Sequence, residues 1–467
     1  MRISLAILII AVTVAVAVPA FADLQNVVVG GSVRIRADWF NYGDNANDNA
    51  FVEQRTRLNV RADFTDAVSA FIELDDYEVW GGGANFVPDA EAAALGTVPD
   101  HLNMPAGQWV SVPTDFRSDY LSGVDGRAST GDNVGLYQAY IEANEMWGTK
   151  LKARIGRQEI KLGSGWLVGP NDKNAFFRGL SFDGVRLTYA TDQFSAEALW
   201  AKLAEQSPLR SDGDVDLYGV YASYLGIENV TLDAYWLFVR DAKNVTKGSR
   251  DTHTVGLRGA GTLGAFDFEA EGAYQWLDLD DGNSDAWAGN LEVGYTFDMD
   301  YTPRVFLAGA YFDGSDKDEP FNRLFSNWEY TMFDFGLLNG KDDFGNDQSF
   351  ANLTNFWTVR GGVSVMPTES LKVALAGGFY QLVDENGEPL SKAAGADKAA
   401  AAANGKPPVV TAKKEKDLGW ELDASVNYAY TKDLSFEVGY AHFFTGDALG
   451  TDSDDFNYFY GETKLSF

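Results

Sequence analysis

The chain has 467 residues, no cysteine and a formal net charge of −31, and aromatic residues make up 14% of it. The acidic excess argues against nucleic acid as a partner, because two polyanions repel each other. Without cysteine there is neither a disulfide framework nor a thiolate site. The length suits one large domain or two to three ordinary ones.

The first 22 residues have the organisation of a secretory signal peptide. Arg2 supplies the charged start, an apolar run follows, and Ala20-Phe21-Ala22 is a small-residue cleavage site. A membrane anchor is the alternative, which the short apolar run and the cleavage site disfavour. We expect a signal peptide over residues 1–22 and one mature domain over residues 23–467. After residue 22 no run of apolar residues reaches the ~18 that a membrane-spanning helix needs. If the mature chain is a membrane protein, it is therefore expected to be a β-barrel.

Two N-terminal segments place arginine at every second position. They are "SVRIRADWF" (32–40) and "RTRLNVRADF" (55–64), in which apolar residues fill most of the alternate positions. Successive side chains of a strand point to opposite faces, so one face is apolar and the other is basic. An arginine facing lipid costs ~2–4 kcal/mol at the membrane midplane. The basic face is therefore expected to point into a water-filled lumen.

Segments with this alternation recur to the last residue, which is typical of transmembrane barrel strands. The pattern indicates an all-β fold, a transmembrane antiparallel barrel whose even strand number lets the first and last strands pair. We predict eighteen strands, at residues 27–40, 53–64, 68–80, 134–143, 149–162, 182–190, 194–203, 215–225, 229–239, 252–262, 264–276, 286–298, 303–313, 354–365, 369–382, 417–430, 433–443 and 455–467.

Short and long connections alternate along the chain, as they do in bacterial barrels with tight periplasmic turns and extended outer loops. By this parity residues 81–133 and 384–416 are external. The first is the expected constriction loop. The second is low-complexity and Ala/Lys-rich, and forms either a disordered tether or a short helix over the mouth. One rim of an aromatic girdle is expected at strand ends beside long connections; it comprises Trp39, Trp80, Trp276, Trp287, Trp357 and Trp420.

Three segments resemble the alginate export family of outer-membrane porins: "LYQAYIEA" (136–143), "RIGRQEIKLGSGWLVG" (154–169) and "FDGVRLTY" (182–189). The resemblance implies an eighteen-stranded barrel, a monomer rather than a trimer, in the outer membrane of a Gram-negative-type bacterium. It also implies an anionic polysaccharide, such as alginate, as cargo. Outer-membrane lipid and lipopolysaccharide are the other expected partners. Members of the family are described with loops gating both mouths, but the inner turns here are too short for a periplasmic plug.

The inward parity of the strands gives a charge map of the lumen. Its expected basic lining is Arg34, Arg36, Arg55, Arg57, Arg61, Lys152, Arg154, Arg157, Arg186, Arg258 and Arg360. A bulge at Gly156 is needed to turn Arg157 and Glu159 inward. An acidic ladder is expected across the pore from the basic one; it includes Asp267, Glu269, Glu271 and Glu292. The two ladders either bind passing uronate-like anions or pair to stiffen the wall.

Acidic outer segments at 277–287, 313–320 and 451–456 could hold Ca²⁺ loosely, and no other cofactor is expected. The candidate ligands are Asp278, Asp280 and Asp281. Catalysis is not expected, because the chain has only three histidines and no catalytic motif. These histidines are His101, His253 and His442.

The expected function is an outer-membrane porin for passive diffusion or export of hydrophilic, anionic, saccharide-like solutes. Two alternatives remain open. One is a general or cation-preferring uptake porin, which the acidic residues favour. The other is a structural or adhesion barrel whose loops occlude the lumen.

Overall fold

All eighteen predicted strands form, each within a few residues of its expected bounds. They are β1 (Asn26–Asn41), β2 (Asn49–Thr65), β3 (Val68–Val79), β4 (Gly135–Ala143), β5 (Leu151–Gln158), β6 (Phe182–Ala190), β7 (Phe194–Ala204), β8 (Val215–Ile227), β9 (Val230–Asp241), β10 (Arg250–Leu263), β11 (Phe266–Leu279), β12 (Gly282–Thr296), β13 (Arg304–Phe312), β14 (Phe356–Thr368), β15 (Leu371–Leu382), β16 (Asp417–Ala429), β17 (Leu434–Thr445) and β18 (Phe456–Ser466).

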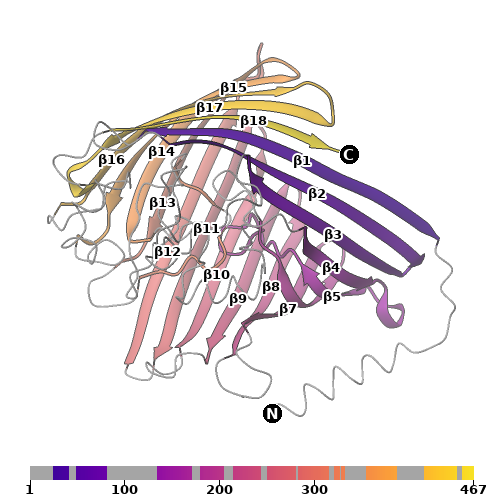
Figure 1. The fold of residues 1–467 in the computed structure, drawn as a ribbon. Helices are drawn as coiled ribbons and strands as arrows, with labels where there is room; N and C mark the ends of the chain where they lie inside the picture. The colour runs from indigo at the N-terminus through magenta and orange to yellow at the C-terminus, as the bar shows by residue number, and fades with distance from the viewer. Residues whose placement is uncertain are drawn as a thin grey trace, which may run out of the picture.

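The computed structural model arranges these strands as one closed antiparallel barrel, the predicted fold class (Figure 1). Each strand pairs with its sequence neighbours, and β1 also pairs with β18. The structure describes residues 25–41, 49–80, 134–170, 179–204, 214–242, 250–279, 282–314, 320–326, 328–331, 354–385, 415–449 and 455–467.

The closing seam joins the two ends of the chain. The register runs from Ser32 opposite Ser466 to Asn41 opposite Asn457. Beyond it, Gly31 and Phe467 exchange two backbone hydrogen bonds of 2.9 and 3.0 Å. Hydrocarbon offers no partner to backbone polar groups, so this seam removes the edges that an open sheet would leave in the membrane.

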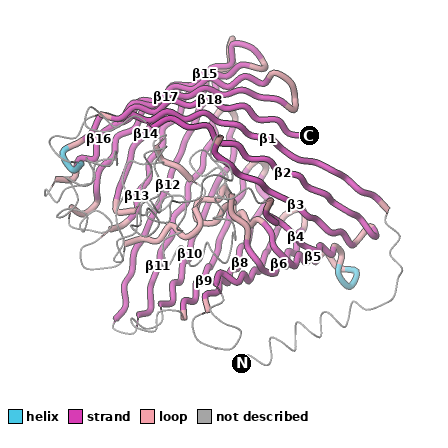
Figure 2. The backbone as a smooth tube through the Cα atoms, in the orientation of Figure 1, coloured by secondary structure: helices cyan, strands magenta, loops and turns pink. Residues whose placement is uncertain are grey.

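Helical structure in the described residues is confined to two single-turn 3-10 segments, Met146–Gly148 and Asp447–Leu449 (Figure 2). No helix in this part of the chain combines the length and the apolar character that crossing a membrane requires.

The alternation in the sequence sorts the side chains between the two faces of the wall as predicted. Apolar side chains on the outer face are exposed, as for Leu257, Leu307 and Ile141. The arginines of β1 and β2 lie on the inner face, where Arg36 is fully buried. The buried arginines thus lie on the face opposite to these exposed apolar side chains.

One expected outer loop is largely strand. The acidic segment 277–287 continues the alternation, so β11 runs to Leu279 and β12 begins at Gly282. Leu277 and Ser284 lie opposite each other and are both buried on the inner side. The apolar and small residues at alternate positions hold this segment in the sheet despite its carboxylates.

The predicted bulge at Gly156 is wrong. β5 pairs with β4 and β6 without a register shift there, although φ of Gly156 is +127°. A Cβ at this position would lie 2.2 Å from the carbonyl oxygen of Ala139, so only glycine fits. The register shift occurs instead between Glu73 and Leu74 of β3, where Tyr137 is the extra residue of β4.

Aromatic rings form a band around the outer face near the long connections. His253 lies between Phe238 and Trp276, with ring centroids 4.3 and 5.0 Å away. Trp287 stacks on Tyr311 at 4.1 Å. These rings are amphipathic and favour the headgroup region of a membrane. The predicted positions Trp276 and Trp287 thus belong to an outer girdle.

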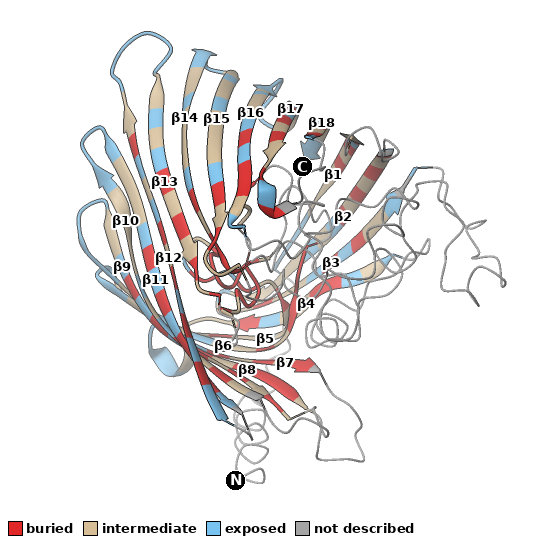
Figure 3. Cartoon of the chain, turned by 90° about the vertical axis from the view of Figure 1, so that its left-hand side faces the viewer, coloured by how far each residue is buried: buried red, intermediate tan, exposed pale blue. Residues whose placement is uncertain are grey.

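Two long connections fold into the barrel. We call residues 159–170 and 320–331, residue 327 excepted, the inward loops; they cross the centre of the barrel in Figure 3. A parallel bridge joins Val168 to Phe325, where Phe325 donates a backbone hydrogen bond to Leu167 at 2.8 Å and accepts one from Gly169 at 2.9 Å. The expected constriction loop, residues 81–133, and the low-complexity segment 384–416 lie almost wholly outside the described residues.

The inward loops carry an apolar core onto the inner wall. Trp166 and Val168 are fully buried among inward residues of β8, β9 and β13, including Leu217, Leu237 and Phe312. Loop backbone is also tied to the wall, because Gln275 of β11 exchanges hydrogen bonds of 2.7 and 2.8 Å with the backbone of Asn322. One sector of the lumen is thereby filled by packed side chains.

Trp166 is the central side chain of this packing. Its indole N–H donates to the hydroxyl of Tyr330 at 2.7 Å, and its ring packs against Phe312 and Phe321. Burial raises the pKa of Tyr330 to about 12, so the hydroxyl stays protonated across the physiological range. This bond fixes one inward loop against the other.

We predict that Trp166→Ala loosens the inward loops while leaving the barrel closed. Truncating a buried tryptophan costs ~3–5 kcal/mol, and here the loss falls on the loop packing and not on the strand ladder. Single-channel recordings should show higher and noisier conductance. Trp287→Ala, at the half-exposed girdle position, is the matched control and should leave conductance unchanged. Equal conductance in Trp166→Ala and the parent would contradict the role given to this packing.

Candidate functional site

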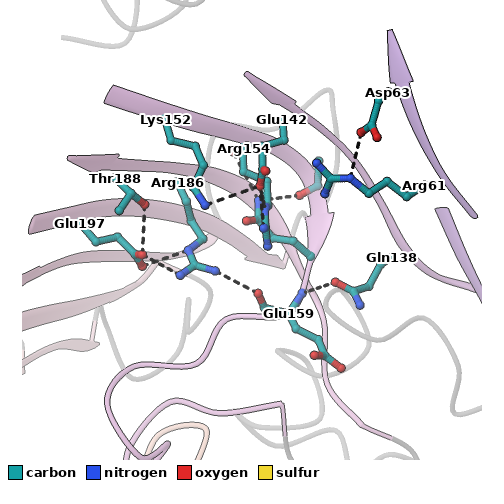
Figure 4. Close-up of polar contacts among 12 residues, drawn as sticks. Arg61, Asp63, Gln138, Glu142, Lys152, Arg154, Glu159, Arg186, Thr188 and Glu197 are labelled. Carbon is teal, nitrogen blue, oxygen red and sulfur yellow. Dashed lines mark hydrogen bonds and ion pairs between the residues drawn. The ribbon is translucent and has the colours of Figure 1, made fainter. Parts of the chain in front are cut away.

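A basic cluster lies on β2, β5 and β6 of the inner wall, beside the start of the first inward loop (Figure 4). Arg61 comes from β2, Lys152 and Arg154 from β5, and Arg186 from β6. The side chains of Arg61 and Lys152 are each 40% exposed and that of Arg154 is 23% exposed. These cations are within reach of water and solutes in the lumen.

Glu142 of β4 holds the centre of the cluster. Arg154 donates to it through Nε and Nη2 at 2.9 and 2.7 Å, and Lys152 Nζ lies 3.8 Å from the same carboxylate. The guanidinium of Arg154 also stacks over the ring of Tyr140, with its Cζ 4.3 Å from the ring centre. One carboxylate thus orients two cations and leaves the cluster with a net positive charge.

The flanking arginines each have a carboxylate of their own. Arg186 makes a two-pronged pair with Glu197 of β7, with distances of 3.0 and 2.6 Å. Arg61 donates to Asp63, two residues along the same strand, at 3.0 Å. Such pairs between neighbouring positions on one face of a sheet are short-range and stabilise by ~0.2–1 kcal/mol each.

Glu159 connects this cluster to the first inward loop. Its backbone N–H donates to Gln138 at 2.9 Å, and its carbonyl oxygen accepts from Arg186 at 3.2 Å. Its carboxylate accepts from Tyr137 at 2.5 Å and lies 3.5 Å from Nη1 of Arg57. Contacts with β2, β4 and β6 therefore fix the start of the first inward loop.

Four other arginines of β1 and β2 are buried in the wall of the barrel. They are buried, with exposures of 5% for Arg34, 0% for Arg36, 2% for Arg55 and 6% for Arg57. Arg34 pairs with Glu462 at 2.7 Å, Arg36 with Asp38 at 3.0 Å and Arg57 with Asp75 at 3.0 Å. A buried charge is tolerated only when it is paired, so these side chains hold the seam region together.

The acidic ladder of β11 does not stand opposite an unpaired basic ladder. Arg258 of β10 bridges Asp233 and Glu269, with Glu271 3.8 Å away. Asp267 and Glu292 both pair with Arg304 of β13, at 2.5 and 2.9 Å. These charges are paired with residues one or two strands away. The acidic residues expected to line the pore thus form ion pairs with arginines on their own side of the wall.

Two predicted lining residues have other surroundings. Arg157 forms a two-pronged pair with Asp183, at 2.8 and 2.7 Å, on the face opposite to Arg154, because β5 has no bulge to turn it inward. Arg360 lies beneath the second inward loop, donates to the carbonyl oxygen of Tyr330 at 3.3 Å, and stacks over its ring. Neither side chain belongs to the basic cluster.

A family model described as "Alginate export" matches residues 26–459. The chain belongs to the alginate export family. The family and the closed barrel together make it an outer-membrane β-barrel channel. No curated protein matches the chain.

Solved structures share the fold of this alginate export family barrel at low identity. OccAB2 of Acinetobacter baumannii is 12% identical, with a TM-score of 0.55 and coverage of 96% of this chain and 99% of its own. OccK8 (OprE) of Pseudomonas aeruginosa is 13% identical, with a TM-score of 0.52 and coverage of 94% and 98%. Both are similar over their full barrels.

Three charged residues that form ion pairs on the inner wall of this alginate export family barrel were not predicted from the sequence. They are Arg304, Glu142 and Glu197, which supply the partners described above. The alternation did indicate these positions. Glu142 lies on the same face of β4 as Gln138, and Arg304 lies on the same face of β13 as the inward residue Ala308. Parity assigns a face, but it does not say which charged residues meet across strands.

Some of the candidate calcium ligands and histidines lie in the described part of this channel. Among these residues no group of three or more His, Asp or Glu side chains could hold a metal ion. Asp278 lies exposed on β11, whereas Asp280, Asp281 and His101 lie outside the described residues. His442 binds Asn457 at 2.8 Å, and His253 stacks in the girdle. Both imidazole rings are held by neighbouring side chains.

We predict that Glu142→Gln shifts the channel towards anion preference. The substitution keeps a hydrogen-bond acceptor for Arg154 but removes the one carboxylate that faces both Arg154 and Lys152. The reversal potential in a KCl gradient should move in the direction of chloride permeation. Glu369→Gln, on the exposed β14–β15 turn, is the matched control and should move it less. A reversal potential equal to that of the parent would show that ions do not pass this cluster.

Proposed function

We propose that this barrel lets hydrophilic, saccharide-like solutes cross the outer membrane by passive diffusion, and that uronate-type sugars bind transiently at the basic cluster. The observation that carries the proposal is the partly exposed set of Arg61, Lys152 and Arg154 on the inner wall. Guanidinium groups present forked donors that match a carboxylate, and ammonium groups add a point charge. The N-terminal 22 residues would direct export as a signal peptide.

The ion pairs give the wall both donors and acceptors. A sugar carboxylate can compete with Glu142 for the donors of Arg154, while sugar hydroxyls can donate to Glu142 or Glu197. Such exchange replaces the water around the solute without a strong single site. Binding that is weak and spread over several positions allows the solute to leave, which conduction requires.

The route is expected to follow the polar sector of β2 to β5. The inward loops fill the apolar sector beside β8, β9 and β13, where Leu217 and Phe312 are fully buried. On the other side, Lys152 and Arg61 are each 40% exposed. A solute would thus pass along one wall and not down the barrel axis.

A general or cation-preferring porin is the second candidate, and the local pairing favours it. Each arginine of the cluster has a carboxylate within 3.0 Å, so the wall carries little excess charge. The two candidates differ in their response to oligouronates. The first binds them at Arg154 and Lys152, and the second does not.

The test is blockade of single-channel current by oligouronate. In Lys152→Gln/Arg154→Gln the apparent dissociation constant should rise about tenfold or more, because two charge-assisted hydrogen bonds are lost. Blockade by a neutral oligoglucoside of equal length should be unchanged. Lys432→Gln, whose side chain is 90% exposed on a turn, serves as the charge control.

Three outcomes would reject uronate binding. They are cation preference of the parent channel, absence of blockade by oligouronate, and equal blockade of the parent and the double variant. Cation preference with free passage of neutral sugars would support the second candidate.

A further inference from the structure

The guanidinium of Arg154 is bound by the protein along one edge, and its other edge keeps donors to spare. Nε and Nη2 both donate to Oε2 of Glu142, at 2.9 and 2.7 Å. Nη1 donates to none of the residues that the structure describes. A guanidinium carries its N–H groups in a fixed planar fork, so the edge formed by Nη1 and Nη2 matches a second carboxylate. A carboxylate on a solute can bind to this edge before it displaces Glu142.

Arg186, which lies opposite Arg154 in the register of β5 and β6, has no such edge. Its Nε and Nη2 donate to Glu197 at 3.0 and 2.6 Å, and its Nη1 donates to the carbonyl oxygen of Glu159 at 3.2 Å (Figure 4). Every guanidinium nitrogen of Arg186 thus has an acceptor in the protein. Of these two opposed arginines, Arg154 is the one that can accept a solute anion without losing a contact.

A stack of aromatic rings lies against one face of the Arg154 guanidinium. Its Cζ is 4.3 Å from the ring centre of Tyr140, and the ring of Tyr140 stacks on Phe71 with centroids 5.2 Å apart. Phe71 and Tyr140 lie opposite each other in the register of β3 and β4, and both are half-buried. Arginine stacks on aromatic faces through its planar, delocalised cation. The guanidinium and the two rings therefore form a continuous stack from β3 to β5.

Gly156 leaves room for this stack. It lies opposite Tyr140 in the register of β4 and β5, two residues from Arg154 and on the same face of β5. The Cβ atoms of opposed residues are ~4.5–5.5 Å apart, so a side chain at this position would lie beside the Tyr140 ring. Because glycine has none, the guanidinium of Arg154 can occupy that space.

The contact with Arg154 uses the ring of Tyr140 and not its hydroxyl group. The hydroxyl makes no hydrogen bond to any residue in the described part of the chain. The nearby Tyr137 differs, because its hydroxyl donates to the carboxylate of Glu159 at 2.5 Å. The ring of Tyr140 can therefore be tested separately from its hydroxyl.

We propose that Tyr140 is a positioning residue of the basic cluster, which holds the guanidinium of Arg154 in one plane with its second edge open to a carboxylate on the solute. The proposal rests on the proposed function, since it concerns the same uronate-type solutes. Glu142 fixes one edge of the guanidinium and Tyr140 fixes its face. A group that is ordered before binding loses less conformational entropy when its ligand arrives. Tyr140 thereby strengthens the binding of carboxylated sugars without adding charge.

Blockade of single-channel current by oligouronate tests this role. Tyr140→Leu removes the ring and should raise the apparent dissociation constant about threefold to tenfold. Tyr140→Phe keeps the ring and should stay within about twofold of the parent. Neither substitution changes a charge, so the reversal potential in a KCl gradient and blockade by a neutral oligoglucoside should keep their parent values. Lys152→Gln/Arg154→Gln, in contrast, should shift the reversal potential.

Phe306→Leu is the matched control. Phe306 lies on β13, outside the basic cluster, and Cζ of Arg304 is 5.6 Å from its ring centre. This variant loses an aromatic partner of a different arginine and should be blocked by oligouronate as the parent is. A second test combines Tyr140→Leu with Arg154→Gln. The combination should be blocked no more weakly than Arg154→Gln alone, because the ring acts through the guanidinium.

Phe71→Leu removes the ring that supports Tyr140 and should weaken blockade in the same direction by a smaller factor. The role of Tyr140 is overturned if neither Tyr140→Leu nor Phe71→Leu weakens blockade, or if Tyr140→Phe loses as much affinity as Tyr140→Leu. It is also overturned if Tyr140→Leu has its full effect when Arg154 is already glutamine. These results leave the proposed function standing. A parent channel that oligouronate does not block would reject the proposed function and this role together.

Discussion

Closure of the hydrogen-bonded ladder is the constraint on which this structure depends. Hydrocarbon cannot satisfy backbone N–H and C=O groups, so each strand must pair on both sides within the membrane. The pairing of β1 with β18 completes the circle, and Arg34 and Glu462 reinforce it on the inner face at 2.7 Å. Once the ring is closed, period-two alternation assigns every side chain to lipid or to the interior. The interior is then free to hold charge, loops and solute without affecting the outer face.

Charge in the interior is organised by short-range neutralisation. Arg36, Arg57 and Arg258 lie close to carboxylates of the same or adjacent strands, because a guanidinium withdrawn from water needs a partner nearby. Around Lys152 and Arg154, beside the inward loops, the cations are partly accessible, with side-chain exposures of 40% and 23%. The boundary between wall structure and candidate binding surface is thus set by the loops and not by the strands.

Sequence alone was sufficient for the strands and their faces, because alternation is a local property that each segment carries independently. It put Arg154 and Arg186 on the same face of neighbouring strands, where they lie opposite each other in the register. It did not find Glu142 as the partner of Arg154, since register across strands depends on turn geometry and shear. It placed the acidic residues at 277–287 in a loop by composition, although Leu277 and Ser284 keep them in the sheet. It could not foresee Trp166 at the centre of the lumen, because nothing in a long connection indicates whether it folds outward or inward.

The seam has a consequence for how the molecule is made. Its two strands come from opposite ends of the polypeptide, and the residues of the Arg34–Glu462 contact are 428 positions apart. Every other strand pair can form between sequence neighbours, but this one must wait until translation and export have delivered the last segment. Closing so long a loop is slow, and until it happens the nascent sheet exposes two reactive borders. Biogenesis of this barrel therefore requires the incomplete chain to be guarded against aggregation until its final strand arrives.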